Sequence, residues 1–339
     1  ENRPGAISVG RVMTCVLGMV VQRERSIREF VKTPFYRILG TIEADGDSFE
    51  AEWRAVEGSR YFNSPKLYKE NGFLKREDAE GLLQEMREPE PLLMKVEKVE
   101  KKVEKKNPPM LYNLADLQND CSRLFKISPD ETLRIVQELY EKKMLTYPRT
   151  DARVLSTAVS KEIQKNISGL RAYPVLAPYA EHIMEEEAYK GIAKTKYVND
   201  KQITDHYAII PTGQGLNAWN SLPPTAKGVY EIVARRFLSV FYPPAEYQKA
   251  SLTLERKGER FFANFKVLYK QGFLEVAGTA SSRKKNEEEE ETKFSPELIR
   301  YIASLKKGSQ VGAKSFDIKE GETKPPSRYT SGTLVIAME

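Results

Sequence analysis

The sequence predicts an α+β fold of several domains, in which the chain enters a β-rich part twice and a helical part is inserted between the two passes. Apolar residues recur at helical spacing in residues 8–31 and in parts of 113–213, whereas residues 35–56 and 246–276 alternate between apolar and polar as strands do. The chain has 339 residues, which is more than one ordinary domain needs.

The first part of the chain is expected to form one long helix followed by strands. The helix over 8–31 ends at Thr33-Pro34, because the residue before a proline disfavours helical geometry. Asp45-Gly-Asp47 predicts a hairpin turn between two strands. A short helix is expected over 76–88.

Residues 94–106 are ambiguous, since their valines fit a helix but the run stops abruptly at Asn107-Pro-Pro109. We favour a basic strand that leaves one domain for another. A helical part follows, with a first helix over 114–125. Ser128-Pro-Asp-Glu131 is a strong helix start, because it combines a cap, a proline at the first position and a glutamate three residues after the cap.

The rest of the chain continues this alternation of helices and strands. Further helices are expected over 157–167, 223–242 and 295–300, strands over 246–276, and a charged linker over 281–291. The last residues, 333–339, read as a helix that is cut, and the first residue is Glu1 rather than Met. We therefore expect this chain to be a piece of a longer protein.

Composition sets limits on the function. Lys and Arg number 54 and Asp and Glu 48, so the formal net charge is +6, which permits a polyanionic partner without requiring one. Two cysteines and two histidines nearly exclude a Cys/His zinc site and a disulfide framework, and suggest a reducing, cytoplasmic location. No apolar run reaches membrane-spanning length, so we expect no membrane partner.

The most informative stretch is Leu145-Thr-Tyr-Pro-Arg-Thr-Asp151. Proline biases the preceding residue toward extended geometry, in which residues i and i+2 share a face. Tyr147 and Arg149 are therefore expected to project side by side. An arginine can bind a phosphate through two N–H groups and can favour a phenolate, as a phosphate-attacking tyrosine requires. A half-buried tyrosine at a strand end is the ordinary alternative.

Three further segments carry candidate phosphate ligands. His206 precedes an apolar run that a proline ends, and it is either a structural histidine or a donor to a phosphate oxygen. Ser8 and Arg11 open a helix, whose N-terminus can be a simple cap or a phosphate site. Lys324 and Arg328 lie in a proline-rich turn beside Tyr329, which is either an ordinary connection or a grip on a nucleic-acid backbone with an aromatic ring for stacking.

Together these segments resemble the type IA DNA topoisomerases, most closely the bacterial topoisomerase III group. The motifs that carry the resemblance span nearly the whole chain and follow the family's order: Ser8-x-Gly-Arg-Val12, Asn113-Leu-Ala-Asp-Leu-Gln118, Leu145-Thr-Tyr-Pro-Arg-Thr-Asp151, Asp205-His-x-Ala-Ile-Ile-Pro-Thr212 and Pro326-Ser-Arg-Tyr-Thr330.

The resemblance implies a toroid in which a β-rich hinge arch carries an inserted helical domain with the active-site tyrosine. It implies that Tyr147 is the nucleophile and that Arg149 and His206 contact the scissile phosphate. The residues implied to bind DNA are Ser8, Arg11, Gln118, Tyr207, Thr212, Lys324 and Arg328. The domains implied are part of the base over 1–33, the hinge arch over 34–112 and 214–276, the tyrosine domain over 113–213, and a linker with the return into the base over 277–339.

Several departures from the family pattern stand out. Met13 stands where most members have glutamine, and Tyr207 where many have a second histidine, although phenol and imidazole can both donate a hydrogen bond. The family's metal-binding domain, with its Mg²⁺ site, would precede residue 1, so we expect no metal in this chain. Asp45-Gly-Asp-Ser-Phe-Glu50 resembles its acidic cluster only superficially, because the spacing differs and the context is a hairpin tip.

The implied activity is ATP-independent cleavage of one DNA strand through a 5′-phosphotyrosine, strand passage and religation. This chain alone is expected to bind single-stranded DNA and to relax nothing. The implied protein is a monomer of the bacterial nucleoid, with a helicase as a candidate partner. The non-enzymatic alternative is a single-strand-binding module. A tyrosine recombinase fits less well because Tyr147 is central, and a relaxase because two histidines cannot build its metal site.

Overall fold

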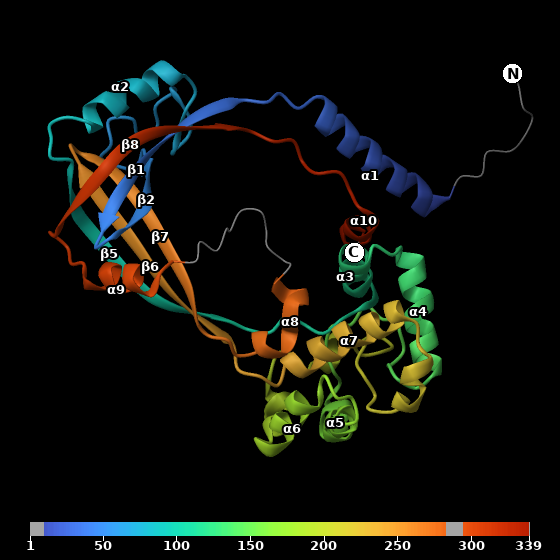
Figure 1. Cartoon of the computed structure of the whole chain (residues 1–339). Coiled ribbons are helices and arrows are strands. Elements are labelled where there is room, and N and C mark those ends of the chain that lie inside the picture. Colours follow the sequence, from blue (N-terminus) through green and yellow to red (C-terminus); the bar gives the residue numbers. More distant parts are fainter. Residues whose placement is uncertain (1–9, 283–293, 339) are drawn as a thin grey trace, which may run out of the picture.

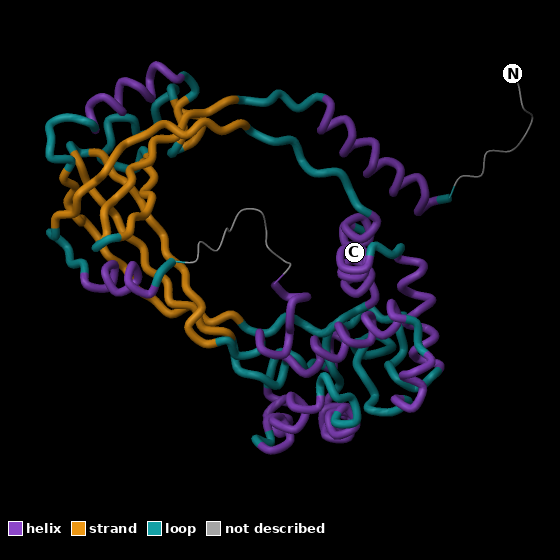
Figure 2. The backbone as a smooth tube through the Cα atoms, in the orientation of Figure 1, coloured by secondary structure: helices purple, strands orange, loops and turns teal. Residues whose placement is uncertain are grey.

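The computed structural model describes residues 10–282 and 294–338, and its elements follow a closed ring (Figure 1). A β-sheet occupies one side of the ring and a body of helices occupies the other (Figure 2). The fold is thus α+β, as predicted, and the chain passes through the β part both before and after the helical body. Ser8 and most of the predicted linker over 281–291 lie outside the described residues.

The sheet has eight strands in the order β2-β7-β6-β5-β8-β1-β4-β3, and β2 also pairs with β1, which closes a barrel. The strands before the helical body are β1 (Pro34–Ala44), β2 (Asp47–Arg54), β3 (Leu67–Lys69), β4 (Gly72–Phe73) and β5 (Leu93–Lys106). Those after it are β6 (Ala245–Arg256), β7 (Glu259–Lys270) and β8 (Gln310–Glu322).

Local sequence explains the strand connections. Asp45 and Gly46 have φ values of 44° and 89°, so the predicted hairpin turn joins β1 to β2 with the left-handed geometry that Asp and Gly tolerate. The ambiguous run before Asn107 is a strand, as we favoured. It pairs with β6 from Lys95 opposite Glu255 to Lys106 opposite Ala245, so the two chain crossings into the helical body are direct neighbours.

The barrel encloses its own apolar core, in which Trp53, Phe73, Phe261 and Phe316 are fully buried. Trp53 donates a hydrogen bond through Nε1 to Glu259 at 2.8 Å, which satisfies a polar group that burial would otherwise penalise. Two helices also contribute buried residues to this core, α2 (Arg76–Met86) and α9 (Pro296–Ser304).

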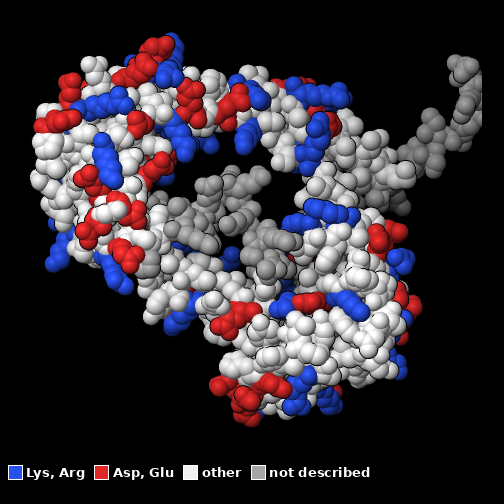
Figure 3. All heavy atoms as spheres, viewed as in Figure 1, with Lys and Arg blue, Asp and Glu red and all other residues white. Residues whose placement is uncertain are grey.

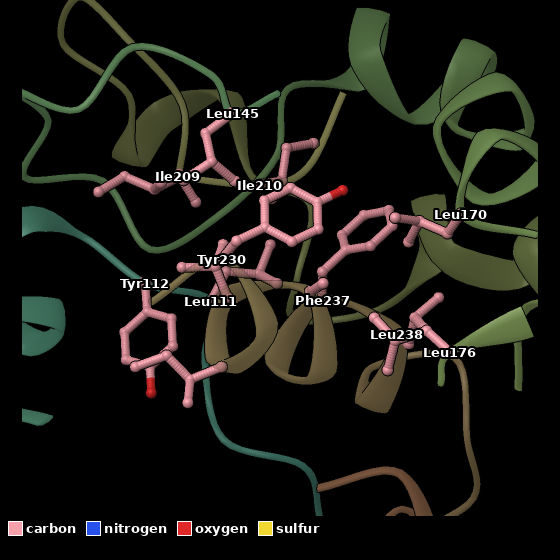
Figure 4. Packing of buried hydrophobic residues seen from close by; sticks show 14 of the residues in the cluster. Leu111, Tyr112, Leu145, Leu170, Leu176, Ile209, Ile210, Tyr230, Phe237 and Leu238 are labelled. Atoms are coloured by element: carbon pink, nitrogen blue, oxygen red, sulfur yellow. The ribbon is translucent and has the colours of Figure 1, made fainter. Parts of the chain in front are cut away.

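The helical body has a second core, shown in Figure 4. Its helices are α3 (Leu114–Phe125), α4 (Pro129–Glu141), α5 (Thr157–Leu170), α6 (Ala177–Glu185), α7 (Pro224–Ser239) and α8 (Leu274–Ser282). Ser128 caps α4 as predicted, since its side chain accepts a hydrogen bond from the Glu131 N–H at 3.1 Å.

One predicted boundary is corrected by this packing. The sequence placed residues 214–276 with the β part, but α7 buries Tyr230, Val233 and Phe237 in the helical core. The physical reason is that α7 presents an apolar face which, in the folded chain, meets Leu145 and Ile210 of the tyrosine-bearing segment (Figure 4). The helical body therefore extends to about the start of β6, and α8 returns to it after β7.

Two helices complete the ring, α1 (Arg11–Arg28) and α10 (Ser331–Ala337). The helix α10 packs on α3 at a close approach: a Cβ added to Gly332 would lie 2.8 Å from the Asn119 Cα atom, so this position needs glycine. The helix α1 leaves Val12 and Met13 65% and 75% exposed. Among the described residues, no helix combines the length and the apolar character that crossing a bilayer demands.

Candidate active site

The segment that bears Tyr147 is fixed between α4 and the segment 209–212. After α4, Lys143 adopts a left-handed φ of 60° and the Met144 N–H bonds the Leu139 carbonyl oxygen at 2.9 Å, which turns the chain back. Leu145 then forms an antiparallel bridge with Pro211. The Thr146 N–H bonds the Ile210 carbonyl oxygen at 3.0 Å.

The segment turns at Pro148, which differs from the extended geometry expected. The Thr150 N–H bonds the Pro148 carbonyl oxygen at 3.1 Å, and this contact two residues back makes a tight turn with Arg149 at its centre. Thr150 also donates from Oγ1 to the His206 carbonyl oxygen at 2.7 Å. Tyr147 and Arg149 line two cavities that share His206, and the side-by-side projection of the two side chains stays a prediction.

The segment carrying His206 and Thr212 is held by close glycine contacts. Gly213 has a φ of 76°, and a Cβ added to Gly169 would lie 2.0 Å from the Gly213 carbonyl oxygen. Asn166 of α5 donates from Nδ2 to the Pro211 carbonyl oxygen at 2.9 Å. These contacts hold residues 211–213 against α5.

The first cavity has a volume of about 590 Å³ and contains Tyr147, which is half-buried. The Tyr147 ring centroid lies 4.4 Å from that of His206 and 5.5 Å from that of Tyr140, at interplanar angles of 43° and 81°. Within the described part of the chain, the Tyr147 hydroxyl has no hydrogen-bond partner, so it is available to a ligand. The other residues that line this cavity include Glu141, Lys143, Tyr207, Thr212 and Gln214.

The second cavity, of about 510 Å³, lies on the other side of His206, which lines both. It contains Arg149 and Gln118 and is bounded by Val335 of α10. Arg149 is exposed and makes no ion pair with any described residue. The two adjoining cavities therefore present the Tyr147 phenol, the Arg149 guanidinium and the exposed His206 imidazole to a ligand.

Three of the predicted DNA contacts lie in these cavities with constrained side chains. Gln118 is 8% exposed, and its Nε2 donates to the Pro129 carbonyl oxygen at 2.9 Å. Thr212 donates from Oγ1 to the carbonyl oxygens of Lys143 and Met144. Tyr207 is half-buried, and burial raises the pKa of its hydroxyl, so it stays a neutral donor.

The other predicted DNA contacts line neither cavity. Arg328 holds the Glu24 carboxylate of α1 through two hydrogen bonds, at 2.6 Å and 3.1 Å, and this pairing lowers the pKa of Glu24. Tyr329, which was either part of an ordinary connection or a ring for base stacking, has the Arg23 guanidinium 4.0 Å from its centroid. Lys324 is exposed. Arg11 begins α1, but its side chain is not among the described ones.

Charge on the face of the ring drawn in Figure 3 is mixed. Figure 3 shows acidic and basic side chains interspersed over this face, with basic ones recurring along the inner edge of the ring. In the described residues, no group of three or more His, Cys, Asp or Glu side chains gathers closely enough to hold a metal ion.

Sequence reasoning missed Tyr140 and Lys143. Tyr140 belongs to the last turn of α4, is 39% exposed, and has its ring centroid 5.5 Å from that of Tyr147. The signal available was its position just before the helix end, which places it beside the chain that turns back. Its contact with Tyr147 depends on the left-handed backbone of Lys143, a conformation that the sequence does not predict.

Comparison with known proteins gives a consistent result. A family model described as DNA topoisomerase matches residues 1–339. DNA topoisomerase 3 of Bacillus licheniformis is 32% identical over 334 residues, which are 98% of this chain and 42% of that protein. DNA topoisomerase 3 of Bacillus subtilis is 32% identical over 335 residues, with the same two shares.

A solved structure is similar as well. Full-length topoisomerase I from Thermotoga maritima superposes with a TM-score of 0.65 at 26% identity, covering 98% of this chain and 48% of that one. The chain thus spans less than half the length of the proteins it matches.

Proposed function

The chain belongs to the type IA DNA topoisomerases, in the topoisomerase III group, and from this premise we propose that Tyr147 cleaves one DNA strand by transesterification. The observation that supports this proposal most directly is the free Tyr147 hydroxyl in an open cavity, with the His206 ring 4.4 Å from its own. Arg149 lines the adjoining cavity.

The reaction balances without an external energy source. The Tyr147 oxygen attacks a backbone phosphorus, a P–O bond to the tyrosine forms, and the P–O3′ bond breaks. The phenolic proton is lost and the leaving 3′ oxygen gains one, so the products are a 5′-phosphotyrosine and a 3′-hydroxyl. The reverse attack reseals the strand, and ATP is not consumed.

Arg149 and His206 act on the phosphate. A tyrosine hydroxyl has a pKa of about 10, so its attack benefits from a cation that stabilises both the phenolate and the negative charge on the phosphate oxygens. Arg149 supplies that cation. His206 lies between the two cavities and donates to a phosphate oxygen when it is protonated. Losing one such donor costs about 100- to 1000-fold in rate.

Mg²⁺ does not fit the residues described here, so no step is assigned to a metal in this chain. The proposal is that the full-length protein binds Mg²⁺ elsewhere. This chain alone would bind single-stranded DNA and leave supercoiled plasmid unrelaxed, which fits its coverage of 42% of the Bacillus relatives. A helicase partner, a monomeric state and a nucleoid location stay predictions.

The test is to trap the covalent adduct. The full-length protein is mixed with a 3′-end-labelled oligonucleotide and denatured, and the labelled protein is measured. Tyr147→Phe should abolish the adduct while DNA retention survives. Tyr68→Phe changes a tyrosine of β3 that is 39% exposed, as Tyr140 is, and should leave the adduct unchanged.

Two results would contradict the proposal. An adduct on the Tyr147→Phe protein would identify a different nucleophile. No adduct on the unmodified protein, with strand binding intact, would favour the non-enzymatic single-strand-binding module. Relaxation of plasmid by this chain alone would overturn only the assignment of inactivity.

A further inference from the structure

The cavity beside Tyr147 is lined by residues that the proposed attack on a phosphate does not use, among them Tyr140. Tyr140 and Tyr147 meet at 81° with their centroids 5.5 Å apart, so the two rings form the walls of a corner rather than a stack. Tyr140 is 39% exposed, although α4 buries its neighbouring apolar residues. Its hydroxyl has no hydrogen-bond partner in the described part of the chain. Neither core packing nor a hydrogen bond explains this tyrosine.

The polar rim of the cavity indicates what can occupy it. Glu141 lies at one wall, where its carboxylate accepts a hydrogen bond from Gln137 Nε2 at 3.1 Å, and a phosphate placed there would be repelled. Lys143 lies at the rim, exposed and without an ion pair to any described residue. The lining thus favours a flat, neutral group inside and an anionic group at the edge.

We propose that this cavity is a stacking subsite for one unpaired nucleobase next to the attacked phosphate, and that Tyr140 is the residue on which the base stacks. This inference rests on the proposed function. A nucleobase is flat and uncharged, and the phosphates that flank it suit Lys143 on one side and Arg149 on the other. The volume of about 590 Å³ lies within the range typical of small-ligand sites.

The subsite gives the strand a defined path. The backbone passes His206, which lines both cavities, so a strand held by Arg149 on one side presents its next base to Tyr140 on the other. Stacking on an aromatic side chain holds any base, because every base has a π face. Stacking on Tyr140 would position the attacked phosphate without requiring a particular base sequence in the DNA strand.

The test measures binding by this chain and needs no cleavage. Fluorescence anisotropy compares a labelled eight-nucleotide thymidine strand with a strand of equal length whose sugars carry no bases. Tyr140→Leu should weaken binding of the thymidine strand by about 5- to 150-fold, the range that loss of one base–aromatic stack implies. It should leave binding of the abasic strand unchanged.

Two control variants make the result specific. Tyr140→Phe keeps the ring and should bind as the unmodified chain does. Tyr68→Leu removes a tyrosine of the same 39% exposure that stacks on Phe35 in the barrel, and should also bind normally. Thermal unfolding followed by circular dichroism confirms that each variant is folded.

Three outcomes would overturn the proposal. Equal loss on both strands would show that Tyr140 acts on the backbone or on the fold, and no loss on either would show that no base enters the cavity. Both leave the proposed cleavage by Tyr147 standing, because the adduct test does not depend on them. Failure of the unmodified chain to bind either strand would count against the subsite and the proposed function together.

Discussion

The side chain of Thr150 donates a hydrogen bond from Oγ1 to the carbonyl oxygen of His206 at 2.7 Å and accepts one from the Ala152 N–H at 3.1 Å. This contact ties the segment of Tyr147 to the segment of His206 across a distance of 56 residues in the chain. Thr150 is 8% exposed, so water cannot readily replace it. The Thr150 hydroxyl therefore acts together with the Thr146–Ile210 hydrogen bond and the Leu145–Pro211 bridge to hold the two candidate catalytic segments in place.

Replacing Thr150 with valine should loosen that link. The shape of the side chain is kept, but the partly buried carbonyl oxygen of His206 and the buried N–H of Ala152 lose their partner, which costs about 1–3 kcal/mol. Urea unfolding should show this loss, and the adduct yield of the full-length protein should fall. Thr150→Ser retains the hydroxyl and should stay close to the unmodified protein. A valine variant of unchanged stability would show that the contact is dispensable.

Gly213 and Gly81 make a matched pair for alanine substitution. Gly213 has a φ of 76°, and an added Cβ would lie 2.6 Å from the Asn166 carbonyl oxygen, so alanine there should destabilise by more than about 1 kcal/mol. Gly81 lies in α2 with nothing within 4 Å of an added Cβ, so alanine should stabilise by up to about 1 kcal/mol. The midpoints of urea unfolding give both signs, and equal signs would contradict the geometry.

Tyr230 and Tyr112 should respond in opposite directions to loss of the hydroxyl. Tyr230 is fully buried and its hydroxyl has no hydrogen-bond partner among the residues that the structure describes, so Tyr230→Phe should be neutral or should stabilise by about 1 kcal/mol. Tyr112 donates to Asp120 at 2.6 Å and accepts from Arg236 at 3.0 Å, so Tyr112→Phe should destabilise by about 1–3 kcal/mol. Denaturant melts of both variants decide this, and a destabilised Tyr230→Phe would point to a partner for that hydroxyl.

Alkaline pH should weaken the helical body. Burial raises the pKa of Tyr173 and of Tyr197 to about 12, above the value of about 10 in the unfolded chain. A raised folded pKa means that the native state holds its proton longer, so the stability is complete below pH of about 10 and falls as pH rises toward about 12. Unfolding free energies measured across that window should decline. A flat profile would show that these hydroxyls ionise without cost.

The ion pair between Arg328 and Glu24 predicts a measurable change in salt dependence. Glu24→Gln frees the Arg328 guanidinium, which is 69% exposed, for a phosphate. If Arg328 lies on the strand path, single-strand affinity should rise, and the slope of log K against log salt should steepen by about 0.7. Since the pair is at the surface, stability should change little. An unchanged slope would remove Arg328 from the DNA path.

Local signals in the sequence predicted much of the fold. The cap at Ser128 starts α4, Asp45 and Gly46 turn β1 into β2, and Pro108 follows the end of β5. Each of these depends on neighbours within a few residues. The order of helices and strands could therefore be predicted before any tertiary contact was known.

The site was harder to predict because it depends on distant contacts. The face toward which Arg149 projects follows from a turn that the Thr150–His206 bond supports, and Tyr140 meets Tyr147 only because Lys143 reverses the chain. The placement of α7 failed for the same reason, since its apolar face fits either core until the partners are known. Glu24 was not recognised as the partner of Arg328, because 304 residues separate them.

The pairing of Lys106 with Ala245, at the point where the chain leaves the barrel and returns to it, has a consequence for how this architecture is encoded. Opposite residues of an antiparallel ladder lie about 5 Å apart, so a tight turn of two residues could join β5 directly to β6. The barrel would then be a self-contained module whose register owes nothing to the helices. The residues between β5 and β6, which include Tyr147, could then be exchanged as one insert without redesigning either strand.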